Sequence, residues 1–221
     1  MTPDGIAAKV RYGYGKAGKK LGDVHTTYRP TLPTTPALAP QNVMAFIPFI
    51  SSATPEGAFK RPSNYNQPLR YGLFDAGATR VGDYIDGATG TYFVASQTAL
   101  EVPMVVACNA MLSVFRGAAA STVNEDVYAG RTVATDSPVL NQFPASLLIA
   151  GRSEAGRLDL PGDSSDRGAV ILLPYVAGAV LRVSDRVQAV FSEPNEISRG
   201  FTISSVELTD LGYRINARVE L

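Results

Sequence analysis

One stretch of the sequence occurs twice in this chain of 221 residues. The first copy starts at residue 76 with Ala-Gly-Ala-Thr-Arg-Val-Gly-Asp-Tyr-Ile, and the second starts at residue 177 with Ala-Gly-Ala-Val-Leu-Arg-Val-Ser-Asp-Arg-Val. With one residue inserted, Asp83 aligns with Asp185, and runs of alternating apolar residues follow at 92–96 and 201–205. Because similar sequences fold into similar units, the repeat favours two tandem β modules over one large domain.

Short apolar runs separated by turn-forming residues predict the strands of these modules. We place the first module at 69–116 and the second at 168–221, each with short strands about ten residues apart. The closing hairpin is the clearest element, because residues 213–221 alternate apolar and polar side chains after a Thr-Asp-Leu-Gly turn. The predicted fold is therefore mainly β, with two related small β-barrel or sandwich modules in tandem.

Residues 1–22 are predicted to form a basic amphipathic helix that packs on something else. Apolar side chains recur there every three or four residues, at Ile6, Val10, Tyr14, Ala17 and Leu21. The basic side chains of this segment are faced by a single acid, Asp4, and they are Lys9, Arg11, Lys16, Lys19 and Lys20. A basic helix face can bind nucleic acid or an acidic partner, although a solvated face is the commoner case.

Residues 23–68 hold eight of the fifteen prolines. Each proline fixes φ and removes a backbone donor, which argues against a continuous helix or a central strand. We therefore predict a long, Pro-rich extended arm, packed either on its own modules or on a neighbouring subunit. The arm carries large apolar side chains that are candidates for this contact: Met44, Phe46, Ile47, Phe49 and Ile50.

Residues 117–167 are predicted to connect the two modules. A small-residue segment follows residue 117, and a turn-rich segment follows residue 158. Between them, the apolar run at 143–149 can pack either as a helical turn entered at Pro144 or as a strand.

The composition limits the classes of partner. Lys and Arg together number 20, as do Asp and Glu, so no net field steers nucleic acid or an anionic membrane. No apolar run approaches the roughly 20 residues of a membrane-spanning helix. The single cysteine, Cys108, permits no intrachain disulfide, and its apolar surroundings predict a buried small hydrophobe. No signal peptide is expected, because the N-terminal charges precede no apolar core.

No catalytic group, metal site or cofactor is predicted. Asp83 and Asp185 each enter a strand after a turn residue, where Asp commonly bonds its own backbone, and we give Asn109 and Asn216 the same interpretation. His25 is the only histidine, so a zinc site with three or four N/S ligands cannot be assembled. The spaced glycines at 13–18 follow no strand and are read as an accidental match to a dinucleotide motif.

Several aromatic side chains suggest either a binding platform or ordinary packing. Because they alternate with Val and Ile, core and cross-strand packing is the favoured interpretation for Tyr71, Tyr84, Tyr92, Phe93 and Tyr213.

Seven stretches spread over most of the chain are similar to the opening, middle and ending of one protein family, and they lie at 12–22, 28–30, 71–75, 82–84, 90–95, 108–109 and 201–214. That family comprises virion structural proteins of tailed bacteriophages. The closing hairpin is also similar to small β-barrel head–tail connector proteins. The resemblance implies a non-enzymatic component of the phage neck or tail, assembled in the host cytoplasm and located in the virion, with no catalytic residue to carry over.

The resulting hypothesis is a homo-oligomeric ring, a collar or a head–tail connector, whose copies are joined by exchange of the arm. The basic helix would then contact an acidic ring of other neck or tail proteins, or face the genome channel. The alternatives are a tail hub, baseplate or decoration protein, a carbohydrate-binding tail module and, last, a hydrolase that uses His25 or Asp83.

Overall fold

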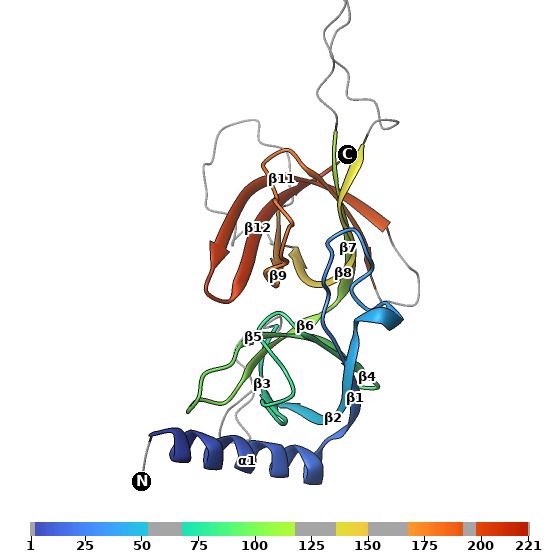
Figure 1. Cartoon of the computed structure of the whole chain (residues 1–221). Coiled ribbons are helices and arrows are strands. Elements are labelled where there is room, and N and C mark those ends of the chain that lie inside the picture. The colour runs from blue at the N-terminus through green and yellow to red at the C-terminus, as the bar shows by residue number, and fades with distance from the viewer. Residues whose placement is uncertain (1–2, 53–67, 118–135, 150–167, 192–197, 221) are drawn as a thin grey trace, which may run out of the picture.

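The structure is a computed structural model that describes residues 3–52, 68–117, 136–149, 168–191 and 198–220. Within these residues, helix α1 (Pro3–Leu21) is followed by two closed six-stranded barrels in tandem (Figure 1). The short 3-10 helix η1 spans Pro40–Asn42. This architecture confirms the prediction of a mainly β protein with two related barrel modules behind an N-terminal helix.

The first six strands of the chain form the first barrel and the next six form the second. The first barrel consists of β1 (Asp23–Tyr28), β2 (Val43–Ser52), β3 (Leu69–Leu73), β4 (Tyr84–Gly87), β5 (Gly90–Ser96) and β6 (Met104–Cys108). The second consists of β7 (Ala110–Arg116), β8 (Ser137–Ile149), β9 (Gly168–Leu173), β10 (Arg186–Phe191), β11 (Ser198–Thr209) and β12 (Gly212–Val219).

The barrels share one topology. Neighbouring strands in the first follow the order β1-β2-β3-β6-β5-β4, and β1 pairs with β4 to close the ring. The second barrel pairs its strands in the same way when six is added to each strand number, with β7 and β10 closing it. A register shift also recurs at the same place, between Val94 and Ser96 and between Ile203 and Ser205. The repeated unit is therefore a complete six-stranded barrel.

This topology corrects the predicted module boundaries. The repeat begins at β1, so β1 and β2 belong to the first barrel, while β7 belongs to the second. Residues 23–52 are thus not an extended arm, and residues 53–67 lie outside the described part of the chain. Proline is tolerated in β2 because β3 pairs only with Ile50–Ser52, which leaves Pro48 with a neighbouring strand on one side. Of the predicted connection, residues 137–149 form strand β8 and not a helical turn.

The residues between β1 and β2, which we term the strap (residues 29–42), tie the first barrel to the second. The amide of Ala37 donates to the carbonyl of Gln142 at 3.1 Å, and the amide of Asn141 donates to the carbonyl of Pro33 at 3.0 Å. Ala37 is fully buried in a core that spans both barrels. Of the two placements considered for the Pro-rich segment, the strap takes the first, against the chain's own modules.

Helix α1 lies across the end of the first barrel that faces away from the second (Figure 1). Its closest approach is made by glycine, because a Cβ on Gly18 would lie 2.7 Å from the carbonyl oxygen of Leu73 and 3.1 Å from that of Pro48. Of the spaced glycines, Gly15 and Gly18 therefore face the first barrel, whereas Gly13 does not. Of the predicted apolar face, Val10, Tyr14 and Ala17 are half-buried. The remaining two, Ile6 and Leu21, are 43% and 66% exposed.

Candidate functional site

The two repeated aspartates perform one structural task twice. Asp83 accepts hydrogen bonds from Arg29 Nε at 2.8 Å and Nη2 at 2.7 Å, and Asp185 accepts the same pair from Arg116 at 2.9 and 2.8 Å. Each carboxylate also accepts the amide of the residue three positions earlier. These carboxylates raise the pKa of both arginine guanidinium groups, and the largest cause is the side-chain hydrogen bonding. Both aspartates are therefore occupied in holding a turn, as the sequence predicted.

Asn109 and Asn216, which received one interpretation from the sequence, occupy different positions in the two barrels. Asn109 lies between the barrels, where its amide group exchanges two hydrogen bonds with the backbone of Leu147. Asn216 lies within β12 and donates to the hydroxyl of Ser205. Met104 pairs with Ser96 on β5 and Asn216 pairs with Ser205 on β11, so the equivalent of Asn216 in the first barrel is Met104.

The candidate nucleophiles and metal ligands are dispersed. His25 is buried, with Nε2 at 2.8 Å from the hydroxyl of Thr89 and Nδ1 at 3.0 Å from the carbonyl of Asp23. Cys108 packs against the core, and burial raises the pKa of its thiol. Within the described residues, no group of three His, Cys, Asp or Glu side chains is placed to hold a metal ion. No helix in that part of the chain is long and apolar enough to cross a membrane.

The aromatic residues pack as predicted. Tyr84, Phe93, Tyr92 and Tyr213 lie in the hydrophobic core, and only Tyr71 is half-buried outside it. Tyr84 also joins the barrels, because its phenol donates to the carbonyl of Pro144 at 2.9 Å.

The predicted interaction residues divide between core and surface. Ile47 and Phe49 point into the first barrel and are 4% and 1% exposed, so they are unable to form an intersubunit contact. Met44 and Phe46 point outward and are 50% and 71% exposed, while Ile50 is half-buried. The predicted basic side chains of α1 are all exposed: Lys9, Arg11, Lys16, Lys19 and Lys20.

The outward side chains of β1 and β2 form an exposed apolar surface, which we term the strip (Val24, Met44 and Phe46). Val24 pairs with Pro48 and Thr26 pairs with Phe46, so Val24 and Phe46 are diagonal neighbours on the outside of the barrel. Val24 is 69% exposed. The sequence reasoning missed Val24, although its alternation with buried His25 and Thr27 is the signal that could have found it.

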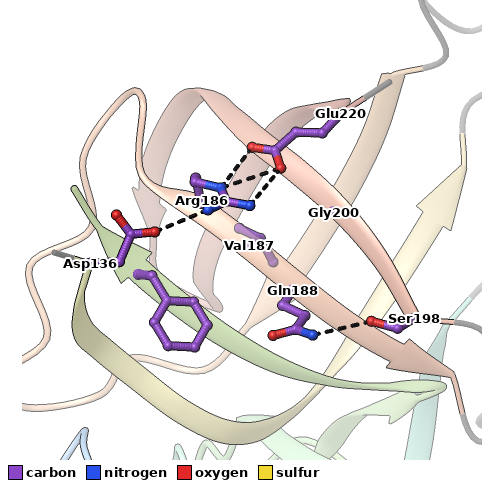
Figure 2. Close-up of a pocket in the computed structure, with 8 residues that line it drawn as sticks. Asp136, Arg186, Val187, Gln188, Ser198, Gly200 and Glu220 are labelled. Carbon is purple, nitrogen blue, oxygen red and sulfur yellow. Dashed lines mark hydrogen bonds and ion pairs between the residues drawn. The ribbon is translucent and has the colours of Figure 1, made fainter. Parts of the chain in front are cut away.

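A pocket of about 530 Å³ lies at the end of the second barrel farthest from α1, and the sequence gave no indication of it (Figures 1 and 2). Arg186 occupies its centre. Nη1 of Arg186 contacts Asp136 Oδ2 at 3.0 Å, and Nε and Nη2 contact Glu220 at 3.2–3.3 Å. These two carboxylates raise the pKa of the Arg186 guanidinium, Glu220 more than Asp136. The other lining residues include Phe115, Gln188, Ser198 and Gly200.

One carboxylate oxygen of the pocket is unsatisfied. The side chain of Asp136 is only 8% exposed, and its Oδ1 atom has no hydrogen-bond partner among the described residues. A buried carboxylate oxygen without a donor is costly, so this atom marks a place where a donor from outside would be stabilising.

The pocket lies at the position in the second barrel that corresponds, by strand register, to the surface with which the first barrel contacts the second. Tyr28 pairs with Tyr84 in the first barrel, and Phe115 pairs with Arg186 in the second. The same registers match Phe93 with Thr202, Val106 with Arg218 and Cys108 with Glu220. The side chains at these equivalent positions are therefore mostly apolar and packed in the first barrel, whereas in the second barrel they are mostly polar and lie at or near an open pocket.

Comparison of the chain with protein-family models, with curated proteins and with solved structures gave no match.

Proposed function

We propose that this chain is a non-enzymatic structural component of a tailed-phage particle, where copies assemble into a ring at the neck as a collar or head–tail connector. The proposal is supported by the similarity of seven stretches to tailed-phage virion proteins. The observation that carries it is the strip, because Val24 and Phe46 are 69% and 71% exposed on the outside of a barrel whose interior is already packed. Apolar side chains grouped in this way are typical of protein interfaces.

The mode of cohesion differs from arm exchange. Within residues 23–52, β1 and β2 are bound in the first barrel and the strap is bound to the second barrel of the same chain, so a neighbouring copy contacts the strip on the barrel surface. A ring requires a contact between two different surfaces of each copy, repeated until the rotation closes. The strip provides one of these surfaces.

Light scattering on the purified chain tests the proposal. Deletion of residues 1–68 would remove β1 and β2, so point substitutions are the suitable tool. We expect a large discrete oligomer that dissociates when Val24→Ser and Phe46→Ser are combined. Leu208→Ser on β11 is the matched control, because Leu208 is 58% exposed but lies away from the strip.

Mass spectrometry of purified phage particles tests the location. The chain should be present in a copy number that equals the number of subunits in one closed ring. Absence from the particle, or a monomer at every concentration together with a copy number of hundreds, would contradict a neck ring and favour a decoration role.

A further inference from the structure

We propose that the pocket around Arg186 receives the basic helix α1 of a second copy, so that copies contact one another head to tail. This inference rests on the proposed self-assembly, and it specifies the two surfaces of one contact. Both surfaces are present in every copy, at opposite ends of the molecule (Figure 1).

Each barrel is covered at the equivalent surface by the element that precedes it in the chain. On the second barrel, the phenol of Tyr84 reaches the carbonyl of Pro144, and Leu172 lines a pocket between the barrels together with Phe93 and Val106. The positions equivalent by register to Pro144 and Leu172 are Pro48 and Leu73 in the first barrel. Those two carbonyls are the atoms that Gly18 of α1 approaches. Helix α1 therefore covers a surface of the first barrel. The equivalent surface of the second barrel is covered by the first barrel.

The repeat leaves one such surface of the second barrel uncovered by the described residues. The first barrel meets the second through the surface around Tyr84, and the second barrel carries the equivalent surface, with Arg186 at that position. If the contact between the first and second barrels is repeated between copies, the Arg186 surface of one copy meets the first barrel of another copy. What it meets there is α1, because α1 lies over the receiving surface of that barrel.

The charges of the pocket suit a basic partner. The described residues that line it include two carboxylates, Asp136 and Glu220, and one cation, Arg186, which is bonded to both. Asp136 Oδ1, buried and without a partner among the described residues, requires a donor. The exposed side of α1 supplies five cations against Asp4. A lysine ammonium carries three donors on a long stem and is suited to enter a pocket of this size.

The shape of the basic side of α1 also suits the pocket. Lys9, Lys16 and Lys20 are separated by seven and four residues, so they lie on one side of the helix, with Tyr12 between the first two. Tyr12 is 71% exposed. A row of cations beside an aromatic side chain complements a carboxylate pocket whose wall includes Phe115.

A mixing experiment tests the contact. The pocket variant carries Asp136→Asn and Glu220→Gln, and the helix variant carries Lys16→Glu and Lys20→Glu. The strip substitutions V24S and F46S are present in both, so that association through the strip is removed. Sedimentation velocity is measured on each variant alone and on an equimolar mixture, at low salt and at 0.5 M salt, after circular dichroism has shown that both are folded.

We expect each variant alone to associate at least tenfold more weakly than the strip-substituted parent. The mixture should form a one-to-one dimer and nothing larger, because it contains one intact pocket and one intact helix. Salt should weaken this dimer. The control Arg80→Glu with Arg182→Glu makes the same change of charge at two exposed arginines of the barrel loops, and it should leave association unchanged.

Other results would overturn the inference. A mixture that associates no better than its components excludes the head-to-tail contact, and so does equal loss of association in the arginine control. Binding of a glycan that is abolished in the pocket variant, with association unaltered, would assign the pocket to carbohydrate instead. A one-to-one dimer from a chain absent from phage particles would uphold the contact and reject the proposed function.

Discussion

Tyr84 and Arg186 occupy the same position in the two barrels, one fully buried between the barrels and the other at the centre of an open pocket. Burial raises the pKa of the Tyr84 phenol well above its ordinary value. The phenol is therefore protonated in the folded chain at pH values where it ionises in the unfolded chain. Stability from this group is complete below about pH 10 and is lost as the pH rises above that value.

We expect Tyr84→Phe to lower the free energy of unfolding by about 1–2 kcal/mol at pH 7, because the carbonyl of Pro144 loses its donor in a buried site. Above pH 10 the free energy of unfolding of the wild-type chain should fall by about a further 1.4 kcal/mol per pH unit because of this phenol. The variant, which lacks the phenol, should not show this additional fall. Urea unfolding at pH 7, 10 and 11 measures both effects. Parallel pH profiles for the two proteins would contradict the burial of this phenol.

The repeated arginine–aspartate pairs should contribute comparably to stability. We expect Asp83→Asn and Asp185→Asn each to cost about 2–4 kcal/mol, because each carboxylate is 3% exposed and holds an arginine and a backbone amide. Chemical denaturation of each variant gives the values, with the exposed Glu207→Gln as control. If one substitution is costly and the other harmless, the two turns do not perform the same task.

Two glycines of α1 provide a matched pair. A Cβ on Gly13 would meet nothing within 4 Å, whereas a Cβ on Gly18 would lie 2.7 Å from a backbone oxygen. Gly13→Ala should therefore stabilise the chain by up to about 1 kcal/mol through helix propensity. Gly18→Ala should destabilise it, since the helix must move away from the barrel. Thermal unfolding by circular dichroism separates the two, and stabilisation by both would mean that α1 is not seated on Leu73.

The thiol of Cys108 should be unreactive in the folded protein. Burial raises its pKa, so the reactive thiolate is scarce at pH 8. Titration with a disulfide reagent should detect no thiol in native buffer within minutes and one per chain in 6 M guanidinium. Rapid labelling of the native chain would show that this strand opens readily.

The sequence predicted the two tandem barrels because the repeat preserves Asp83 and Asp185 at the most constrained turns. It misplaced the start of each barrel because β1 and β2 do not resemble β7 and β8 in sequence. Prolines were taken as evidence against strands, yet Pro48 and Pro144 are equivalent and both lie where a strand has a partner on one side only. Local rules overestimate the cost of proline when the sheet is incomplete beside it.

The pocket was beyond prediction for a different reason. Asp136, Arg186 and Glu220 are separated by 50 and 34 residues and meet only because the start of β8, the start of β10 and the end of β12 reach the same end of the barrel. No spacing rule connects them. The exposed strip, in contrast, follows from strand alternation once β1 and β2 are recognised, so that part of the surface was within reach of the sequence.

The strap has a consequence for synthesis on the ribosome. Its Thr34 carbonyl accepts a hydrogen bond from Asn141, 107 positions further along the chain. The first hairpin leaves the exit tunnel long before that partner exists, so its loop has no surface to settle on until β8 has emerged. All six strands of the first barrel leave the ribosome before β7, whereas the strap reaches its final contacts only after β8 has been made, so the two parts of this hairpin are completed at different stages of synthesis.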